Sequence, residues 1–350
     1  MGMQILAKIQ WTGLQFDSYS WVVRQWNEES RETLMTTLIP VIVESCEENG
    51  RDVRCYTLRS TAGEPLPSFT PGAHVDLHLG DGIIRSYSLL DPHAEDAPYR
   101  IAIKRQPGGR GGSVLAHEQL TKGERIQISA PRNNFVFDEQ DERVVLLAGG
   151  IGITPIFSML KRAQELEMDW TLHYAVPTAS AAALKAEIDD IVGQEAEHRF
   201  HFHCDDVRPL DLAATISAYP VGTRFYCCGP EGMLAAFHSK HGEHPAENFR
   251  SERFSADVEK AAGGFTVIAA RSGAEIFVPE SKTILDALLD HGIEIPHSCC
   301  EGFCGTCRTP VLSGRPDHRD VILSDAEKAA NDQILVCCSG SLDSRLELDI

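Results

Sequence analysis

The chain has 350 residues, a length that suits two or three domains rather than a single core. Its formal net charge of −19 argues against a nucleic-acid surface, because phosphate backbones are bound by clustered Lys and Arg. No apolar run approaches the roughly 20 residues of a membrane helix, so we expect a cytoplasmic protein that binds no membrane. Eleven cysteines without a secretory segment favour metal ligation or free thiols over a disulfide scaffold.

Residues 38–137 are predicted to form an antiparallel β-barrel. Short β-rich runs are separated here by Gly and Pro, which is typical of small all-β domains. A single helical stretch, 113–120, interrupts them. The six β-rich runs are 39–43, 53–58, 74–79, 83–89, 99–104 and 125–128.

Residues 138–255 change to an alternation of strand and helix. This rhythm predicts an α/β domain with a parallel sheet wrapped by helices, and a nucleotide would bind at the carboxyl ends of its strands. The predicted strands are 144–147, 171–175, 200–204 and 224–227, and the predicted helices are 155–166, 181–191 and 231–238.

A segment of small and polar residues, 256–264, is predicted to be a linker. Residues 265–350 then form a third, α+β unit. Its pattern predicts a hairpin from 265–270 and 275–278, followed by a helix over 283–291 and a cysteine-rich loop.

That loop carries the strongest functional signal in the chain. Cys299, Cys304 and Cys307 have Cys-x4-Cys-x2-Cys spacing and Cys337 follows 29 residues later, the arrangement of a plant-type [2Fe-2S] cluster. A zinc site is the alternative, but such sites usually contain two Cys-x2-Cys pairs. Two doublets leave a choice between neighbours, and spacing favours the first member of each over Cys300 and Cys338.

Two segments of the predicted barrel indicate a flavin site. In the run Arg85, Ser86, Tyr87 and Ser88, a guanidinium can grip a phosphate, an aromatic ring can stack on an isoalloxazine, and a hydroxyl can hydrogen-bond its N5 atom. The glycine-rich stretch 108–113 opens a predicted helix, where backbone N–H groups bind anions; it contains Gly111, Gly112 and Ser113. A surface turn is the alternative for this stretch.

Two further segments indicate a nicotinamide nucleotide site. Residues 146–155 join a strand to a helix, and their glycines would let a pyrophosphate approach the backbone; they contain Gly149, Gly150, Gly152, Thr154 and Pro155. After a later strand, Cys228, Gly229 and Pro230 are predicted to line the nicotinamide pocket, although Cys-Gly-Pro is also an ordinary turn. We expect hydride transfer near Ser88 and Cys228.

In this order the motifs resemble the phthalate dioxygenase reductase family, which includes vanillate O-demethylase reductase components. The similarity extends from residue 38 to 350 and also includes Glu252, Phe254 and residues 316–320. It implies a flavin barrel, an NAD domain and a ferredoxin domain in that order. It further implies a reductase that passes electrons from NADH through FMN and the [2Fe-2S] cluster to a separate Rieske-type oxygenase.

Individual residue roles follow from the same resemblance. Arg85 and Ser113 would hold the FMN phosphate, Tyr87 would pack on the flavin ring, Ser88 would face N5, and Phe254 would lie near the other face of the ring. Cysteines 299, 304, 307 and 337 would hold the cluster. A protein that docks transiently with its oxygenase is expected to be a monomer.

The chain departs from the family pattern in two places. Residues 176–180 lack the basic residue that often follows the second strand of the NAD domain, which favours NADH over NADPH without excluding NADPH. Residues 1–37, with three of the four tryptophans, have no counterpart, and we expect Met35 to be the true first residue.

Two other functions are compatible with parts of the sequence. A stand-alone NADH diaphorase would reduce small acceptors such as quinones, but it would not need a ferredoxin domain. A pure electron carrier would not need the intact flavin and nucleotide motifs. His238, His241 and His244 recur every third residue, and the Gly and Pro of this segment favour a solvated loop over a metal site.

Overall fold

The computed structural model describes residues 38–350 apart from 81–82, 93–96, 109–110, 194–196 and 255–258. The N-terminal extension, including the expected start at Met35, lies outside the described residues. Residues Leu38–Ile350 form one compact unit. No helix among the described residues is long and apolar enough to cross a membrane.

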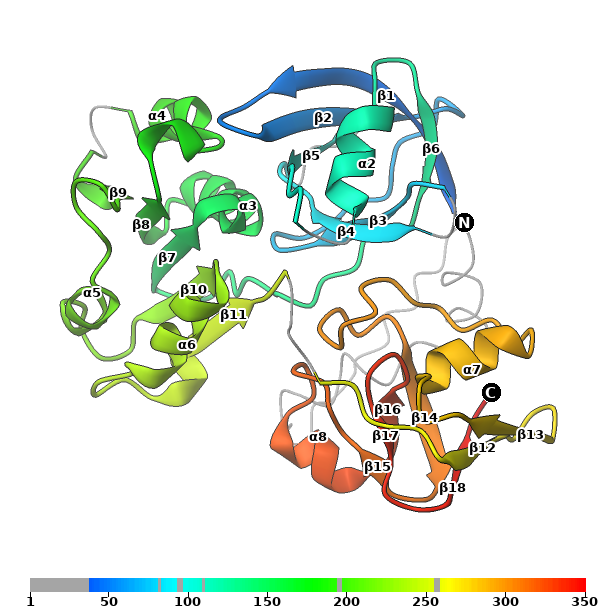
Figure 1. Ribbon diagram of the computed structural model, residues 1–350. Coiled ribbons are helices and arrows are strands. Elements are labelled where there is room, and N and C mark those ends of the chain that lie inside the picture. Colours follow the sequence, from blue (N-terminus) through cyan, green and yellow to red (C-terminus); the bar gives the residue numbers. More distant parts are fainter. Residues whose placement is uncertain (1–37, 81–82, 93–96, 109–110, 194–196, 255–258) are drawn as a thin grey trace, which may run out of the picture. The chain divides into compact units, whose positions relative to one another are not determined.

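The first part of this unit is an antiparallel six-stranded sheet (Figure 1). Its strand order is β4-β3-β6-β1-β2-β5, and a bridge between Leu89 and Ile101 joins the two ends of the sheet. The predicted barrel is therefore observed, with the helix α2 (Gly112–Gln119) beside it. The strands are β1 (Ile39–Glu48), β2 (Val53–Ser60), β3 (His74–His78), β4 (Ile84–Ser88), β5 (Tyr99–Lys104) and β6 (Arg125–Ile128).

The second part is a five-stranded parallel sheet of order β11-β10-β7-β8-β9. The helices α3 (Ile153–Glu165) and α4 (Lys185–Val192) cover one face, and α5 (Leu212–Ser217) and α6 (Glu231–Ser239) cover the other (Figure 1). Sequence analysis did not predict α5 or the fifth strand. The strands are β7 (Arg143–Gly149), β8 (Asp169–Val176), β9 (Phe200–Cys204), β10 (Arg224–Cys228) and β11 (Phe249–Glu252).

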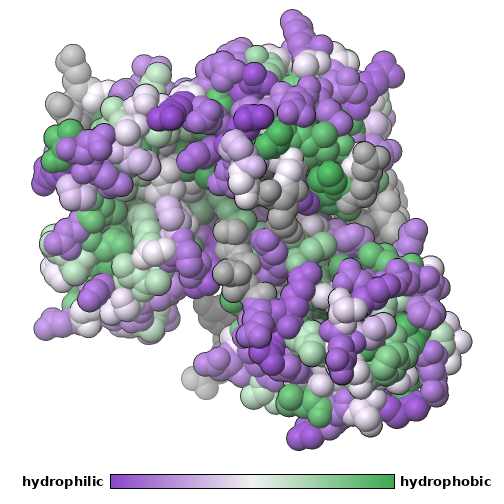
Figure 2. Space-filling model, viewed as in Figure 1, coloured by the Kyte–Doolittle hydropathy of each residue, from purple (hydrophilic) through white to green (hydrophobic). Residues whose placement is uncertain are grey.

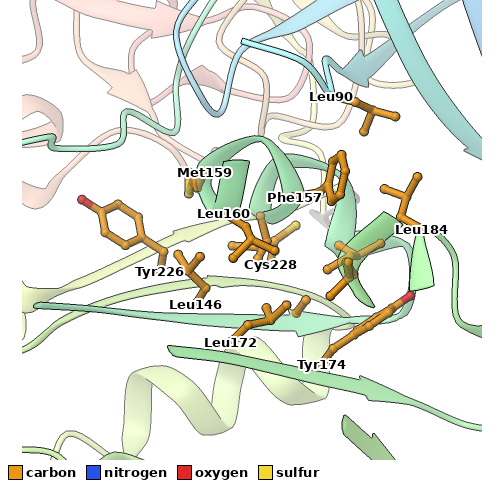
Figure 3. Close-up of a cluster of buried hydrophobic side chains, with 14 of the residues drawn as sticks. Leu90, Leu146, Phe157, Met159, Leu160, Leu172, Tyr174, Leu184, Tyr226 and Cys228 are labelled. Carbon is orange, nitrogen blue, oxygen red and sulfur yellow. The ribbon is translucent and has the colours of Figure 1, made fainter. Parts of the chain in front are cut away.

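The barrel and the parallel sheet share one apolar core. Leu90, just after β4, packs with Phe157 of α3, and both belong to a buried cluster that also contains Leu146, Leu172 and Tyr226 (Figure 3). At the edge of this contact Arg100 of β5 forms paired hydrogen bonds with the carboxylate of Glu187 in α4. Apolar packing of this extent fixes the two parts against each other.

The third part is a mixed five-stranded sheet of order β13-β12-β18-β14-β16. The hairpin of β12 (Phe265–Ala269) and β13 (Ala274–Val278) confirms the predicted pairing, and a capping box of Thr283 and Asp286 begins α7 (Ile284–Asp290). The other elements are β14 (Arg308–Ser313), β15 (Pro316–Asp317), α8 (Asp325–Ala330), β16 (Gln333–Leu335), β17 (Gly340–Ser341) and β18 (Arg345–Leu348).

This third part has its own hydrophobic core. All the buried residues of that cluster lie between Phe265 and Leu348, so among the described residues it does not merge with the barrel core. The end of the predicted linker belongs to it, because the Ala261 amide donates to the carbonyl of Cys338 and Gly264 donates to Val278. Polar side chains cover much of the face seen in Figure 2, as the strongly charged composition requires.

Two glycines in left-handed conformation provide a matched test of packing. A Cβ atom on Gly72 would lie 2.0 Å from the carbonyl oxygen of Phe135, whereas one on Gly63 would meet nothing within 4 Å. Gly63→Ala should cost only about 1–2 kcal/mol from the backbone conformation. Gly72→Ala adds a steric overlap worth roughly 1–3 kcal/mol more, so its melting temperature should fall further. Thermal unfolding followed by circular dichroism checks this, and equal shifts would contradict it.

Candidate functional site

Residues of all three parts line a cavity of about 360 Å³. The barrel contributes Arg85 and Ser88, and the cysteine-rich loop contributes Cys299 and Cys304. The parallel sheet contributes residues 251–254, which are the end of β11 and the two residues after it. Predictions from three separate motifs therefore meet at one place. A cavity of this volume, with both polar and apolar walls, suits a small-molecule cofactor.

Arg85, which lines the cavity, and the N-terminus of α2 form an anion-binding arrangement. A Cβ atom on Gly112, at the start of α2, would lie 2.5 Å from Nε of Arg85, so the guanidinium group lies directly against this helix N-terminus. Gly111 precedes the helix in a left-handed conformation, with φ of 80°. The hydroxyl of Ser113 accepts a hydrogen bond from the Gln106 amide, which leaves its own proton available. A guanidinium beside free helical N–H groups is a phosphate-binding arrangement.

The three side chains that follow Arg85 in β4 have different surroundings. Ser88 is 4% exposed and lines the cavity. Tyr87 is half-buried against the barrel core, and burial raises the pKa of its hydroxyl to about 12. Ser86 also lines the cavity, but its hydroxyl donates to Asp76, so this side chain is committed to a contact within the protein.

The predicted nucleotide loop packs directly on the Cys228 turn. A Cβ atom on Gly152 would lie 2.2 Å from the carbonyl oxygen of Cys228, and one on Gly149 would lie 2.6 Å from Pro230. These two glycines are thus required by protein packing. Gly150, with φ of 55°, has open space around its Cα atom and is the glycine of this loop that leaves room for a ligand.

Other predicted residues of this region have structural positions. Pro155 lies in the first turn of α3, and the hydroxyl of Thr154 donates to the carbonyl of Ile151. The prediction that Cys228, Gly229 and Pro230 line the nicotinamide pocket stays a prediction, but the structure places the Cys228 side chain away from open space. This side chain is 1% exposed and belongs to the shared apolar core, and burial raises the pKa of its thiol well above the ordinary value (Figure 3). The backbone carbonyl of Cys228 and the backbone of Gly229 lie against Gly152 of the predicted nucleotide loop.

Two titratable groups of the cavity were not assigned a role from the sequence. His74, opposite Ser88 in the β3–β4 pairing, is 5% exposed, and neither ring nitrogen has a hydrogen-bond partner among the described residues. Burial, and then the charge of Arg132, lowers the pKa of His74 to about 4, so its ring is neutral. Only the strand pairing, which needs the fold, could have placed it beside Ser88.

Glu252 is the second such group, at the end of β11. Part of the residue is accessible, but its Oε2 atom is buried and lacks a hydrogen-bond partner among the described residues. Burial raises the pKa of this carboxyl to about 8. Glu252 therefore supplies a neutral carboxyl to the cavity at pH 7. Phe254, two residues further, is 40% exposed and lines the same cavity.

The histidines near this region only partly match their prediction. His238 lines the cavity and its ring contacts the Ser251 hydroxyl at 2.8 Å. His244 is 7% exposed and packs against Phe225, so the prediction of a solvated loop was wrong for it.

The described residues contain no group of three or more His, Cys, Asp or Glu arranged around a single metal ion.

The four cysteines selected by spacing form two contacting pairs. Contact with Cys299, together with burial, raises the pKa of the Cys304 thiol, and contact with Cys337 does the same for Cys307. Cys299 also contacts Cys337, which joins the pairs. All four side chains are buried, between 1% and 6% exposed. Two pairs of thiols are the donor set that two irons with four cysteine ligands require.

The second members of the doublets occupy different positions. Cys300 adopts φ of 55°, and its thiol points to the carbonyl of Ser298 at 3.7 Å. The thiol of Cys338 contacts Cys337, the carbonyl of Leu335 and the Ser339 hydroxyl. The Cys337 thiol contacts both Cys299 and Cys307, which is consistent with the choice made from spacing. The Cys338 thiol also faces the cysteine-rich loop, because a Cβ atom on Gly302 would lie 2.6 Å from its Sγ atom, so the choice stays a prediction.

Comparisons with known proteins agree with this organisation. Residues 40–137 match the family model of the oxidoreductase FAD-binding domain, residues 146–239 that of the oxidoreductase NAD-binding domain, and residues 267–340 that of the 2Fe-2S iron-sulfur cluster binding domain. The fold and the site thus define an oxidoreductase with flavin-binding, NAD-binding and [2Fe-2S] domains.

The family follows from similarity over nearly the whole chain. The solved structure of phthalate dioxygenase reductase is 32% identical, with a TM-score of 0.68, and the match covers 89% of this chain and 98% of that one. Vanillate O-demethylase oxidoreductase of Pseudomonas sp. (strain HR199 / DSM 7063) is 40% identical, over 89% of this chain and 100% of that protein. The chain belongs to the phthalate dioxygenase reductase family.

Other similar proteins differ in their names and lengths. Tetrachlorobenzoquinone reductase of Sphingobium chlorophenolicum is 46% identical, over 86% of this chain and 94% of that protein. An intact type IV self-sufficient cytochrome P450 monooxygenase has a TM-score of 0.80 and 32% identity. That match covers 90% of this chain but only 41% of the P450 chain.

The buried carboxyl of Glu252 predicts a pH dependence of stability. Because its pKa is raised in the folded protein, the folded state retains a proton that the unfolded state releases between about pH 4.5 and pH 8. Its contribution to stability therefore falls as pH rises through this window and levels off above it. The melting temperature of Glu252→Gln relative to wild type should rise from pH 5 to pH 9.

Differential scanning fluorimetry across this range measures the difference, and Glu247→Gln, on an exposed side chain nearby, is the control. A difference between Glu252→Gln and wild type that does not change with pH would contradict the assignment.

Proposed function

We propose that this protein is the reductase component of a Rieske-type oxygenase system, and that it transfers electrons from NADH to a separate oxygenase. The observation that carries the proposal is the meeting of the Arg85 strand, the segment around Glu252 and two cluster cysteines in one cavity. Relatives with names of oxygenase reductases, such as phenoxybenzoate dioxygenase subunit beta and carnitine monooxygenase reductase subunit, support it.

The barrel residues fit a flavin, and we propose FMN. Arg85, the backbone of Gly111 and Gly112, and Ser113 would hold its phosphate. Tyr87, Ser88 and Phe254 would contact the ring system, as the resemblance implies. The anion site described above, a guanidinium beside one helix N-terminus, suits a terminal phosphate. The buried and unpartnered nitrogens of His74 also need a polar group in the cavity.

The nucleotide would be NADH, held over the carboxyl ends of the parallel strands. Gly150 leaves space beside the loop that begins α3, and Gly149, Gly152, Thr154, Pro155, Gly229 and Pro230 shape that loop and the turn it packs on. Residues 176–180, after β8, carry no basic side chain for the extra phosphate of NADPH. Asp205 and Asp206, which follow β9 at the same edge, would repel it.

Cys299, Cys304, Cys307 and Cys337 would hold the [2Fe-2S] cluster. A bound flavin accepts a hydride from nicotinamide and releases electrons singly, and a bound cluster carries one electron to the partner. The protein would position the bound flavin, nicotinamide and cluster and exclude water from the cavity. Ser88 lines the cavity, and burial raises the pKa of the Glu252 carboxyl and of the Cys228 thiol, so neither group would place a negative charge near a bound nicotinamide at pH 7. The protein would act as a cytoplasmic monomer.

A second candidate function is the reduction of a small acceptor such as a quinone. The name tetrachlorobenzoquinone reductase of a 46% identical relative favours it. The two functions share the path from NADH into the cavity and differ in the last acceptor. Comparing the rates of electron transfer to a purified Rieske-type oxygenase and to a benzoquinone would separate them.

Anaerobic titration of the purified protein with NADH tests the proposal directly. Flavin absorbance should bleach, cluster absorbance should fall, and electron paramagnetic resonance of the reduced sample should show a rhombic [2Fe-2S] signal. NADPH should be a poorer donor. A protein whose cluster stays oxidised after the flavin bleaches would contradict the reductase function.

The cysteine assignment predicts different outcomes for two neighbouring residues. Cys337→Ser should lose the cluster and its electron delivery and keep the reduction of flavin by NADH, because Cys337 contacts both Cys299 and Cys307. Cys338→Ser should retain the cluster, since spacing assigns the ligand role to Cys337 and the Cys338 thiol has other partners in the Leu335 carbonyl and the Ser339 hydroxyl. Iron and sulfide analysis with absorbance spectra checks both variants, and equal cluster loss would overturn the assignment.

A further inference from the structure

The joint between the barrel and the cluster loop is polar, in contrast to the apolar joint between the barrel and the parallel sheet. Among the described residues, the buried core of the cluster-binding part includes no barrel residue, whereas barrel residues such as Leu90 and Phe135 belong to the core of the parallel sheet. Among the described residues, several side-chain hydrogen bonds cross from the barrel to the cluster loop.

Asp76, in the middle of β3, is the centre of these hydrogen bonds. The residue is 3% exposed, and its carboxylate has partners on three separate segments. Oδ1 accepts from the hydroxyl of Ser86 at 2.7 Å and from the hydroxyl of Ser298 at 2.9 Å, and Oδ2 accepts from Nη2 of Arg132. Ser86 and Ser298 also contact each other, at 2.9 Å.

A carboxylate in this position is costly unless all its partners stay in place. Removing a charge from water is unfavourable, and a buried ion pair is stable only with good geometry and additional hydrogen bonds. Burial opposes ionisation of Asp76, but the charge and hydrogen bond of Arg132 outweigh it and lower the pKa of the carboxyl below its ordinary value. A charged Asp76 therefore demands that Ser298 remain close to the barrel.

The partners of Asp76 are next to the redox sites on both sides. Ser86 lies between Arg85 and Tyr87 of the flavin strand, and Ser298 is followed directly by Cys299. One carboxylate oxygen thus bonds both the strand that faces the proposed flavin and the residue before a proposed cluster ligand.

Two other barrel residues extend the same contact to the next ligand. Arg132 reaches the hydroxyl of Thr306 at 3.3 Å, and this hydroxyl lies 3.2 Å from the thiol of Cys304. The side-chain amide of Asn134 donates to the carbonyl of Cys304 at 2.7 Å. Both Cys299 and Cys304 are therefore tied to the barrel through short polar connections.

We propose that Asp76 is a positioning residue that fixes the cluster loop against the flavin-binding strand and so sets the rate at which electrons cross between them. The inference rests on the proposed function. It assigns to Asp76 no contact with flavin, nucleotide or iron. Its action is through Ser86, Ser298 and Arg132.

Two variants test this role. Asp76→Asn removes the negative charge that pairs with Arg132 and replaces one acceptor oxygen with an N–H donor, so the guanidinium and the two hydroxyls can no longer all donate to this side chain in the present geometry. Ser298→Ala removes the contacts of this hydroxyl with Asp76 and Ser86. It keeps the ion pair within the barrel, so it remains informative if Asp76→Asn folds poorly. Ser45→Ala is the matched control, since it removes a hydroxyl contact of 2.9 Å with Thr57 inside the barrel.

The first measurement is hydrogen exchange of the oxidised, cofactor-loaded protein, without NADH. Amides of residues 298–307 should exchange faster in Asp76→Asn and Ser298→Ala than in wild type or Ser45→Ala. This readout is independent of electron flow, so it tests the contact even if the proposed function fails. Unchanged exchange in both variants would overturn the proposal.

The second measurement is anaerobic stopped-flow reduction with NADH, followed at separate flavin and cluster wavelengths. Flavin reduction should keep its wild-type rate, and cluster reduction should slow by about tenfold or more, because small losses of alignment have large effects on rate. Iron content and the paramagnetic resonance signal should remain those of wild type. A wild-type rate of cluster reduction in both variants would show that Asp76 serves stability alone and would overturn the positioning role.

Discussion

The close contact between the barrel and the parallel sheet is the constraint on which the rest of the structure depends. Leu90, just after β4, and Phe157 of α3 belong to one buried cluster, and Arg100 of β5 pairs with Glu187 of α4 at its edge. Because an apolar core of this density transmits displacement rather than absorbing it, the cavity walls supplied by these two parts keep a fixed separation. The nucleotide and flavin motifs can therefore act together although they lie on different sheets.

The cluster-binding part is attached to the barrel by polar contacts instead of apolar packing. Its hydrophobic core is self-contained among the described residues, and charged and hydroxyl groups around Asp76 connect it to the barrel. Polar contacts give orientation at little net gain in stability, since each group gives up water in order to pair. The barrel and the parallel sheet are thus joined by a rigid apolar contact. The cluster-binding part is joined to the barrel by directional hydrogen bonds.

Sequence reasoning was most successful where the determinants are local. The flavin-binding, NAD-binding and 2Fe-2S domains that the family models match were each recognised from motifs of neighbouring residues. The roles of single residues within those motifs stay predictions. The barrel, the parallel sheet and the hairpin of the third part were also predicted from periodicity and turns. Elements without a strong period, such as the short α5 and β11, were missed.

The features that sequence could not supply depend on distant contacts. Asp76 and Ser298 are 222 residues apart, and nothing near either one indicates the other. The burial of Glu252 and of His74 likewise results from the assembly of the cavity, which no local pattern encodes. Cys228 was placed in the pocket by its motif, whereas its side chain fills the core and its backbone carbonyl makes the useful contact.

The self-contained core of the cluster-binding part also has an evolutionary consequence. A module that buries its own apolar surface can be gained, lost or exchanged without rebuilding the core of its neighbour. Its attachment to the barrel uses side-chain hydrogen bonds, such as those of Ser298 and Thr306, and no shared apolar cluster among the described residues. The cluster-binding part, and with it the choice of electron acceptor, can then change in evolution separately from the barrel and the parallel sheet.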